Sequence, residues 1–130
     1  MEVNNLSGFS VDTELLQKAV KTVLKEEKRG EEKISVALVK GKKMRELNKT
    51  YRGKDYITDV LSFFHDEKDF LGEIVICPEK IEKKKNFTKE ICRVSIHGTL
   101  HLLGYNHENE KEEKKMEEKT DYYMSQVLKV

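Results

Sequence analysis

Proline, cysteine and long apolar runs are all scarce in this chain, and each absence excludes a class of protein. One proline among 130 residues argues against a Pro-rich linker. No run of about 18 apolar residues is present, so we expect no transmembrane helix. The first ten residues lack a basic segment followed by an apolar one, so we expect no secretory signal. The two cysteines, Cys77 and Cys92, stand outside any C-x-x-C pair, which predicts two buried thiols in a reducing cytoplasm.

Net charge is nearly absent, although charged residues are abundant. The chain has 25 basic and 24 acidic residues, a formal net charge of +1, and charged residues make up 38% of it. An average soluble domain has roughly 25%. Because the basic and acidic charges nearly cancel, the protein as a whole does not attract nucleic acid. Any RNA site must therefore be local. The length suits one domain over residues 1–130, with a small core under a heavily charged surface.

Hydrophobic periodicity predicts a mixture of helices and short strands. The first helix has Asp12 as its candidate N-cap and Gly30 as its stop signal. A helix that is apolar on most sides, and therefore buried, begins at its candidate cap Thr88 and stops at Gly104. The expected elements are a helix over 12–29, a strand over 33–40, a helix over 42–50, a turn-rich loop over 51–57, strands over 59–64 and 71–77 joined by a polar connection over 65–70, a helix start at Pro78, a solvated Lys-rich stretch over 79–89, the buried helix and a last helix over 108–128.

This order of elements predicts an α/β fold of the mixed α+β type. A small mixed β-sheet would pack on the buried helix, and the other helices would cover the rest of the core. Strand order does not follow from the sequence.

Three of the four histidines, His97, His101 and His107, fall within the segment HGTLHLLGYNH. His97 and His101 are four residues apart on the expected buried helix, so their imidazoles lie one turn apart on one face. A left-handed glycine at Gly104 would let the chain turn back, so that His107 completes a set of three nitrogen ligands. Three protein ligands leave one position for water, which is typical of catalytic zinc; nickel or another divalent ion also suits such ligands. The alternative is three unrelated histidines.

The protease signature H-E-x-x-H is incomplete in this chain. It requires a glutamate directly after the first histidine, to act as general base, and Gly98 stands at that position. A zinc metalloprotease-like hydrolase is therefore disfavoured, and stays an alternative.

Three segments together resemble the signatures of the YbeY family, which comprises bacterial metal-dependent endoribonucleases that act in rRNA maturation. HGTLHLLGYNH resembles the family's H-G-x-L-H-L-x-G-Y-D-H, LNKTYRGKDYITDVLSF resembles its second signature, and LGEIVI resembles L-G-D-I-V-I. They occur in the family's order and span most of the chain, from about Ile34 to Met124. The chain departs from the pattern at Asn106 and at Glu73, where the family has Asp.

The resemblance implies that His97, His101 and His107 hold one zinc ion, or another divalent ion. It also implies that Arg52 and His97 are catalytic. Only four of the 25 basic residues are arginines, and a guanidinium pairs bidentately with phosphate as lysine cannot. From its spacing alone, Arg52 would be a surface residue in a turn.

Other residues are candidates for supporting roles. Glu73 and Asp59 are candidates to orient a ligand histidine by accepting its second N–H; Asp59 as a strand cap is the alternative. The basic residues from Lys42 to Lys54 either extend a phosphate-binding patch or coat a solvated helix face.

The resemblance further implies a metzincin-like arrangement around the metal, and a single-strand-specific endoribonuclease. Its expected role is in ribosomal RNA maturation, at the 3′ end of the small-subunit rRNA, and in ribosome quality control. The expected partners are RNA and the ribosome or its proteins, in the cytoplasm, with no membrane and with a monomeric chain. A second alternative to the endoribonuclease is a non-catalytic, ribosome-associated factor that uses the metal only for stability.

Overall fold

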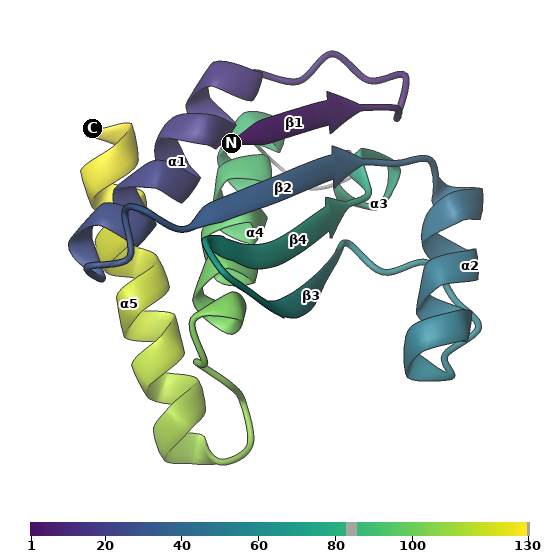
Figure 1. Cartoon of the computed structure of the whole chain (residues 1–130). Coiled ribbons are helices and arrows are strands. Elements are labelled where there is room, and N and C mark those ends of the chain that lie inside the picture. The colour runs from purple at the N-terminus through teal and green to yellow at the C-terminus, as the bar shows by residue number, and fades with distance from the viewer. Residues whose placement is uncertain (83–85, 130) are drawn as a thin grey trace.

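The computed structural model describes residues 1–82 and 86–129, and it contains a four-stranded mixed sheet (Figure 1). The strands are β1 (Glu2–Asn5), β2 (Lys33–Leu38), β3 (Val60–Glu67) and β4 (Phe70–Ile76), in the spatial order β1-β2-β4-β3. β2 pairs in parallel with both β1 and β4, whereas β3 pairs antiparallel with β4 and forms one edge of the sheet. The expected α+β class with a small mixed sheet is confirmed.

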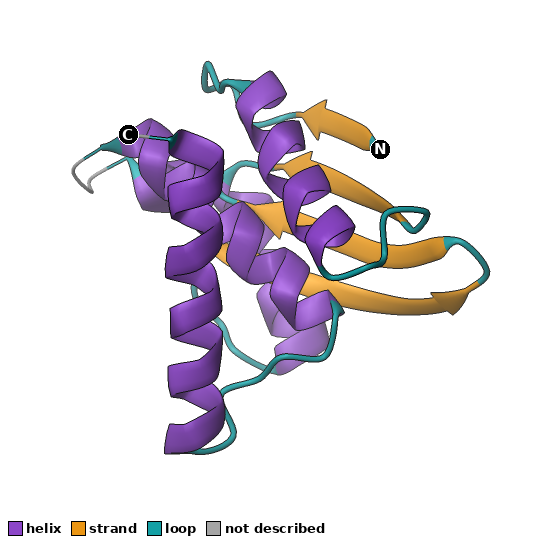
Figure 2. Ribbon diagram, turned by 90° about the vertical axis from the view of Figure 1, so that its left-hand side faces the viewer, coloured by secondary structure: helices purple, strands orange, loops and turns teal. Residues whose placement is uncertain are grey.

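The helices are α1 (Thr13–Glu26), α2 (Gly41–Arg52), α3 (Pro78–Ile81), α4 (Phe87–Leu102) and α5 (Glu110–Leu128). α1, α4 and α5 form a layer on one face of the sheet (Figure 2). α2 stands apart from that layer, beyond the end of β2 (Figure 1). No helix in the described part of the chain is long and apolar enough to cross a membrane.

α4 lies at the centre of the core, which explains why its sequence is apolar on most sides. One side of α4, with Ile91 and Val94, packs with α1 and with the inner residues of β2 and β4, such as Ile74. The opposite side, with Ile96 and Leu100, packs with α5. Because α4 is held from both sides, side chains on its remaining face have a rigid support.

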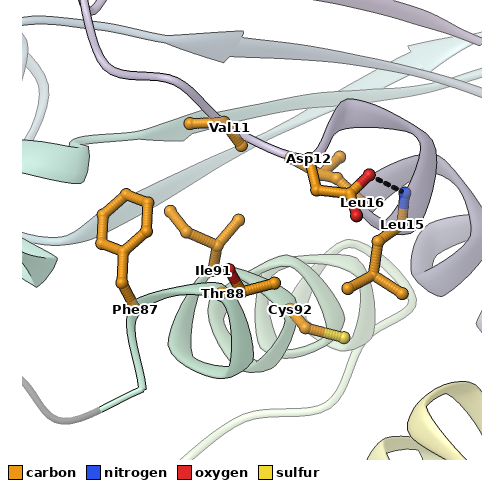
Figure 3. Close-up of a pocket in the computed structure, with 8 residues that line it drawn as sticks. All are labelled: Val11, Asp12, Leu15, Leu16, Phe87, Thr88, Ile91 and Cys92. Carbon is orange, nitrogen blue, oxygen red and sulfur yellow. Dashed lines mark hydrogen bonds between the residues drawn. The ribbon is translucent and has the colours of Figure 1, made fainter.

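The N-terminal end of α1 closes over the start of α4 (Figure 3). The Asp12 carboxylate accepts a hydrogen bond from the Leu15 backbone N–H at 3.0 Å, which confirms the predicted N-cap. The cavity left between the two helices measures about 10 Å³, enough for about one water molecule. The contact between α1 and α4 is therefore closely packed and is no ligand site.

A third hydrophobic cluster lies on the other face of the sheet. Side chains alternate along a strand, so Val75 points away from the face of its neighbours Ile74 and Ile76. Val75 and its β3 partner Leu61 pack there with Met44 of α2. This cluster fixes α2 against the sheet.

The structure corrects several boundaries. α1 ends at Glu26, four residues before the expected stop signal Gly30, and the left-handed residue that follows the helix is Lys28. Asn86, not Thr88, is the cap of α4, and it makes no side-chain capping bond. β3 continues to Glu67, so most of the expected polar connection is strand.

Two further expectations concern the thiols and the Lys-rich stretch. Cys77 and Cys92 are free and buried, as predicted. α3 begins at Pro78 as expected, but residues 83–85 of the Lys-rich stretch lie outside the described residues.

Candidate metal centre

Three imidazoles meet beside the C-terminal end of α4. His97 and His101 lie one turn apart on α4, and their ring centroids are 4.8 Å apart. The His107 ring lies 4.9 Å from that of His97 and 5.0 Å from that of His101. One nitrogen from each ring lies within 4.8 Å of the others. The structure thus brings together the three histidines that the sequence singled out, in a group that could hold a metal ion.

The turn that returns His107 to α4 is a Schellman motif. Gly104 has φ +104°, a conformation that residues with a Cβ rarely adopt. The Gly104 N–H donates to the His101 carbonyl at 3.0 Å, and the Tyr105 N–H donates to the Leu100 carbonyl at 3.1 Å. Both bonds satisfy carbonyls that the end of a helix leaves unpaired. The predicted role of Gly104 is confirmed.

The same turn orients the His101 ring. Its Nδ1 lies 3.0 Å from the Tyr105 carbonyl oxygen, which can only accept, so Nδ1 carries the proton. Nε2 of His101 is then unprotonated and carries a lone pair. The Nε2 atoms of His97 and His107 are 3.0 Å apart. Zn–N bonds of about 2.0–2.1 Å in a tetrahedron place nitrogens about 3.3 Å apart, so the spacing of this pair is close to that of two ligands of one small divalent ion.

The electrostatics of the site favour neutral rings. Burial, and after it the charges that His101 and His107 would carry, lower the pKa of His97 to about 4, although the Asp59 carboxylate acts in the opposite direction. Burial also lowers the pKa of His101, with a smaller contribution from His107. Since only a neutral imidazole can bind a metal, these environments prepare both rings as ligands at neutral pH.

Arg52 lies in the same cleft as the three histidines. The cleft measures about 500 Å³, and its walls also include the segment from Thr58 to Ser62. Arg52 is the last residue of α2 rather than part of a loop, and Gly53 ends the helix with φ +69°. The Asn48 side chain donates to the Tyr56 carbonyl at 2.9 Å and so holds the following loop. The positive charge of Arg52 contributes to the lowered pKa of His101.

Phe64 is a wall of this cleft that our sequence analysis did not single out. It lies on β3, and 63% of it is exposed. Phe63 and Phe64 are adjacent, so their rings point to opposite faces of the sheet, and Phe63 packs against Tyr51 of α2. Two consecutive aromatic residues in an expected strand could have indicated this residue, because side chains alternate along a strand and the two rings cannot both point to the same face.

The two candidates for orienting a ligand histidine differ. Asp59 lines the cleft, and its charge acts on His97. Glu73 is exposed and neighbours Ile74, whose side chain contacts α4 at Gly98. Successive strand residues point to opposite faces, so Glu73 points away from α4. The hypothesis that Glu73 orients a histidine is wrong, and the Tyr105 carbonyl does this for His101.

The nearby basic residues of α2 are exposed, and Arg45 is bound to Asp55 at 2.7 Å. Asn106 at the family's Asp position closes a local turn, since its side-chain oxygen accepts from the Glu108 N–H at 3.0 Å.

Known proteins give an independent assignment. The sequence profile of the family described as Endoribonuclease YbeY matches residues 2–128. A protein of Vesicomyosocius okutanii named Endoribonuclease YbeY is 39% identical over 123 residues, which cover 87% of this chain and 85% of that protein. A protein of the same name from Thermotoga maritima is 41% identical over 120 residues, covering 88% of this chain and 79% of the other.

A solved structure agrees in fold. The solution structure of a Thermotoga maritima protein superposes with a TM-score of 0.68 at 36% identity, over 96% of this chain and 88% of the other. The profile match covers nearly the whole chain, and the relatives match over most of their own length. The chain therefore belongs to the YbeY family of endoribonucleases.

Proposed function

We propose that residues 1–130 act as a single metal-dependent endoribonuclease domain that cleaves single-stranded RNA. The observation that carries the proposal is one open cleft that contains three convergent imidazoles and the Arg52 guanidinium. A trio of nitrogen donors matches zinc in its catalytic coordination, and nickel is an acceptable substitute. When bound, such an ion supplies a Lewis acid for the phosphate and lowers the pKa of water.

The residues that line the cleft have separate proposed roles. His97, His101 and His107 would hold the ion, and His97, whose pKa is lowered to about 4 mainly by burial, also lines the cleft that would receive the substrate. Arg52 would donate two of its N–H groups to oxygens of the scissile phosphate, and would stabilise the charge that develops there. The exposed ring of Phe64 offers a surface on which one unpaired base can stack.

A peptidase is not supported by this geometry. Gly98, which occupies the position of the glutamate in H-E-x-x-H, faces the sheet rather than the cleft. A Cβ there would lie 2.9 Å from Ile74 Cγ2 and 3.1 Å from Ser62 Oγ. Helix α4 therefore packs too closely against the sheet to leave ordinary room for a glutamate at position 98.

We further propose a role in ribosomal RNA maturation, at the 3′ end of the small-subunit rRNA, and in ribosome quality control. The family assignment supports this role. The chain would act as a monomer in the cytoplasm, with the ribosome or its proteins as partners. Its small net charge means that RNA affinity depends on the cleft and on such a partner.

The test combines metal analysis with RNA cleavage. Purified wild-type protein should contain about one zinc or nickel ion per chain and should cut a single-stranded RNA but not the same sequence in a duplex. His101→Ala should lose both the ion and the activity. Arg52→Ala should keep the ion and lose about 10²–10³-fold in kcat, the usual loss of one transition-state charge contact.

Arg29→Ala is the matched control, since Arg29 pairs with Glu32 at 3.0 Å and takes no part in the cleft. It should cleave at the wild-type rate. Arg52→Ala cleaving as fast as this control would contradict the proposed role of Arg52. Chelation separates a catalytic ion from a structural one, because only loss of a structural ion unfolds the protein.

A further inference from the structure

The carboxylate of Glu27 collects three hydrogen bonds at the point where α1 meets α5 and the turn after α4. Tyr105 Oη donates to Oε1 at 2.7 Å, and Lys119 Nζ donates to Oε2 at 3.0 Å. Tyr123 Oη donates to the same Oε2. The Glu27 side chain is only 15% exposed. The proposed reaction uses none of these four side chains directly.

The donors keep Glu27 ionised. Burial by itself would raise the pKa of Glu27, but the hydrogen bonds from Tyr123, Tyr105 and Lys119 outweigh it and lower the pKa. Burial and the same carboxylate raise the pKa of Tyr105, so its hydroxyl stays protonated as a donor. Hydrogen bonds to a charged acceptor are roughly twice as strong as neutral ones. The Tyr105 ring is therefore firmly anchored.

Tyr105 is also the residue whose backbone orients the metal centre. Its carbonyl oxygen holds Nδ1 of His101 at 3.0 Å, and it lies two residues before His107. Its ring packs in the cluster between α4 and α5, with the Lys115 ammonium 5.6 Å from its centre. One residue thus joins the Glu27 carboxylate, through its hydroxyl, to the His101 imidazole, through its carbonyl.

We propose that Glu27 is a positioning residue for the metal centre, which acts through Tyr105 to fix the His101 ring and the start of the segment that carries His107. This inference rests on the proposed metal site. Hydrogen bonds to the outer nitrogen of a metal-bound histidine commonly change metal affinity about 10–100-fold when they are lost. Loosening the Tyr105 anchor should therefore weaken ion binding even where the fold is intact.

The experiment measures Zn²⁺ affinity of the full chain by competition with a chromophoric chelator, and unfolding of the metal-free protein in urea. Tyr105→Phe removes only the anchoring hydroxyl and should weaken Zn²⁺ binding about tenfold. Glu27→Gln should weaken it in the same direction, because a neutral amide holds the hydroxyl less strongly. The absorption bands of bound Co²⁺ should shift in both variants, since the geometry of the ligands changes.

Tyr122→Phe is the matched control. Tyr122 lies on α5 and donates to Glu26, the neighbour of Glu27, at 2.7 Å, so its loss removes a hydrogen bond to Glu26 and none of the three hydrogen bonds to Glu27. It should leave Zn²⁺ affinity and the Co²⁺ spectrum unchanged. Tyr105→Phe and Glu27→Gln variants that lose stability but bind Zn²⁺ as tightly as the wild type would overturn the inference and leave the metal site standing. A wild-type protein that binds no divalent ion would overturn both.

Discussion

Replacing Gly98 by alanine tests how closely α4, the helix that carries His97 and His101, approaches the sheet. Two effects oppose each other in this variant. Alanine favours a helix over glycine by about 1 kcal/mol. The added Cβ, however, would lie 2.9 Å from Cγ2 of Ile74, and 3.1 Å from Ser62 Oγ. Overpacking of a filled core commonly costs about 1–3 kcal/mol.

The sign of the change in stability depends on whether the atoms around the new Cβ can move. Ile74 is fully buried in the core, and Ser62 Oγ is held by its hydrogen bond to the Gly98 carbonyl at 3.0 Å. Neither is the free end of a flexible side chain, so α4 itself has to move outward. Subtracting the helix gain from the packing cost, we expect a net destabilisation of about 0–2 kcal/mol. The shift should also weaken Zn²⁺ binding, because His97 precedes Gly98 directly.

Urea unfolding of the metal-free protein measures this, with Gly30→Ala as the control. A Cβ at Gly30 has its nearest neighbour, Lys25 Cα, at 3.7 Å, and the residue does not have a positive φ. That variant should gain about 0.4–1 kcal/mol by restricting the unfolded chain. If Gly98→Ala were stabilised by as much as Gly30→Ala or more, the close contact between α4 and the sheet would be refuted.

Three further predictions concern the same region. Gly104→Ala should lower the free energy of urea unfolding by about 1–2 kcal/mol, because φ is +104° at this position. It should also weaken Zn²⁺ binding, since the turn leads to His107. An unchanged Zn²⁺ affinity would contradict the role of the turn. In the metal-free protein, NMR should show His97 titrating near pH 4. Because the pKa of His97 is lowered from 6.5 in the folded state, burial of the neutral ring contributes its full share to the free energy of unfolding above pH 6.5. This contribution is lost as the pH falls toward 4. A titration of His97 at 6.5 would show that the ring is not buried. Burial raises the pKa of the Cys92 thiol to about 11, so iodoacetamide should not label Cys92 in the folded protein and should do so in urea; fast labelling of the native thiol would contradict its burial.

Local patterns predicted the histidine-bearing part of the molecule well. The i, i+4 histidines, the apolar surroundings of α4 and the stop at Gly104 all depend on the periodicity of one helix and on the backbone freedom of one glycine. Such features need no knowledge of distant residues. Arg52 was predicted as a functional residue only from the family resemblance, because its position in the sequence does not indicate that it lies near His97. It reaches the same cleft through the packing of α2 against β3.

Long-range features were not predictable. β1 has the polar sequence EVNN and is held by parallel pairing with β2, so hydrophobic alternation gave no sign of it. The expected polar connection over 65–70 became strand because Phe70 pairs with Glu67 across a tight turn. The Glu27 cluster joins residues 78 to 96 positions apart in the chain. No local pattern marks one glutamate among the 24 acidic residues as the partner of Tyr105.

The two sides of the cleft are supported by different parts of the hydrophobic core. The imidazoles come from one eleven-residue segment seated between the sheet and α5, whereas Arg52 ends a helix that is anchored through Met44 on the reverse face of the sheet. They meet across the edge strand β3. Repacking around Met44 would therefore tilt the guanidinium relative to the three imidazoles without displacing the imidazoles. At the site proposed above, substitutions around Met44 would thus change how a phosphate group is bound while the three ligand positions stay the same.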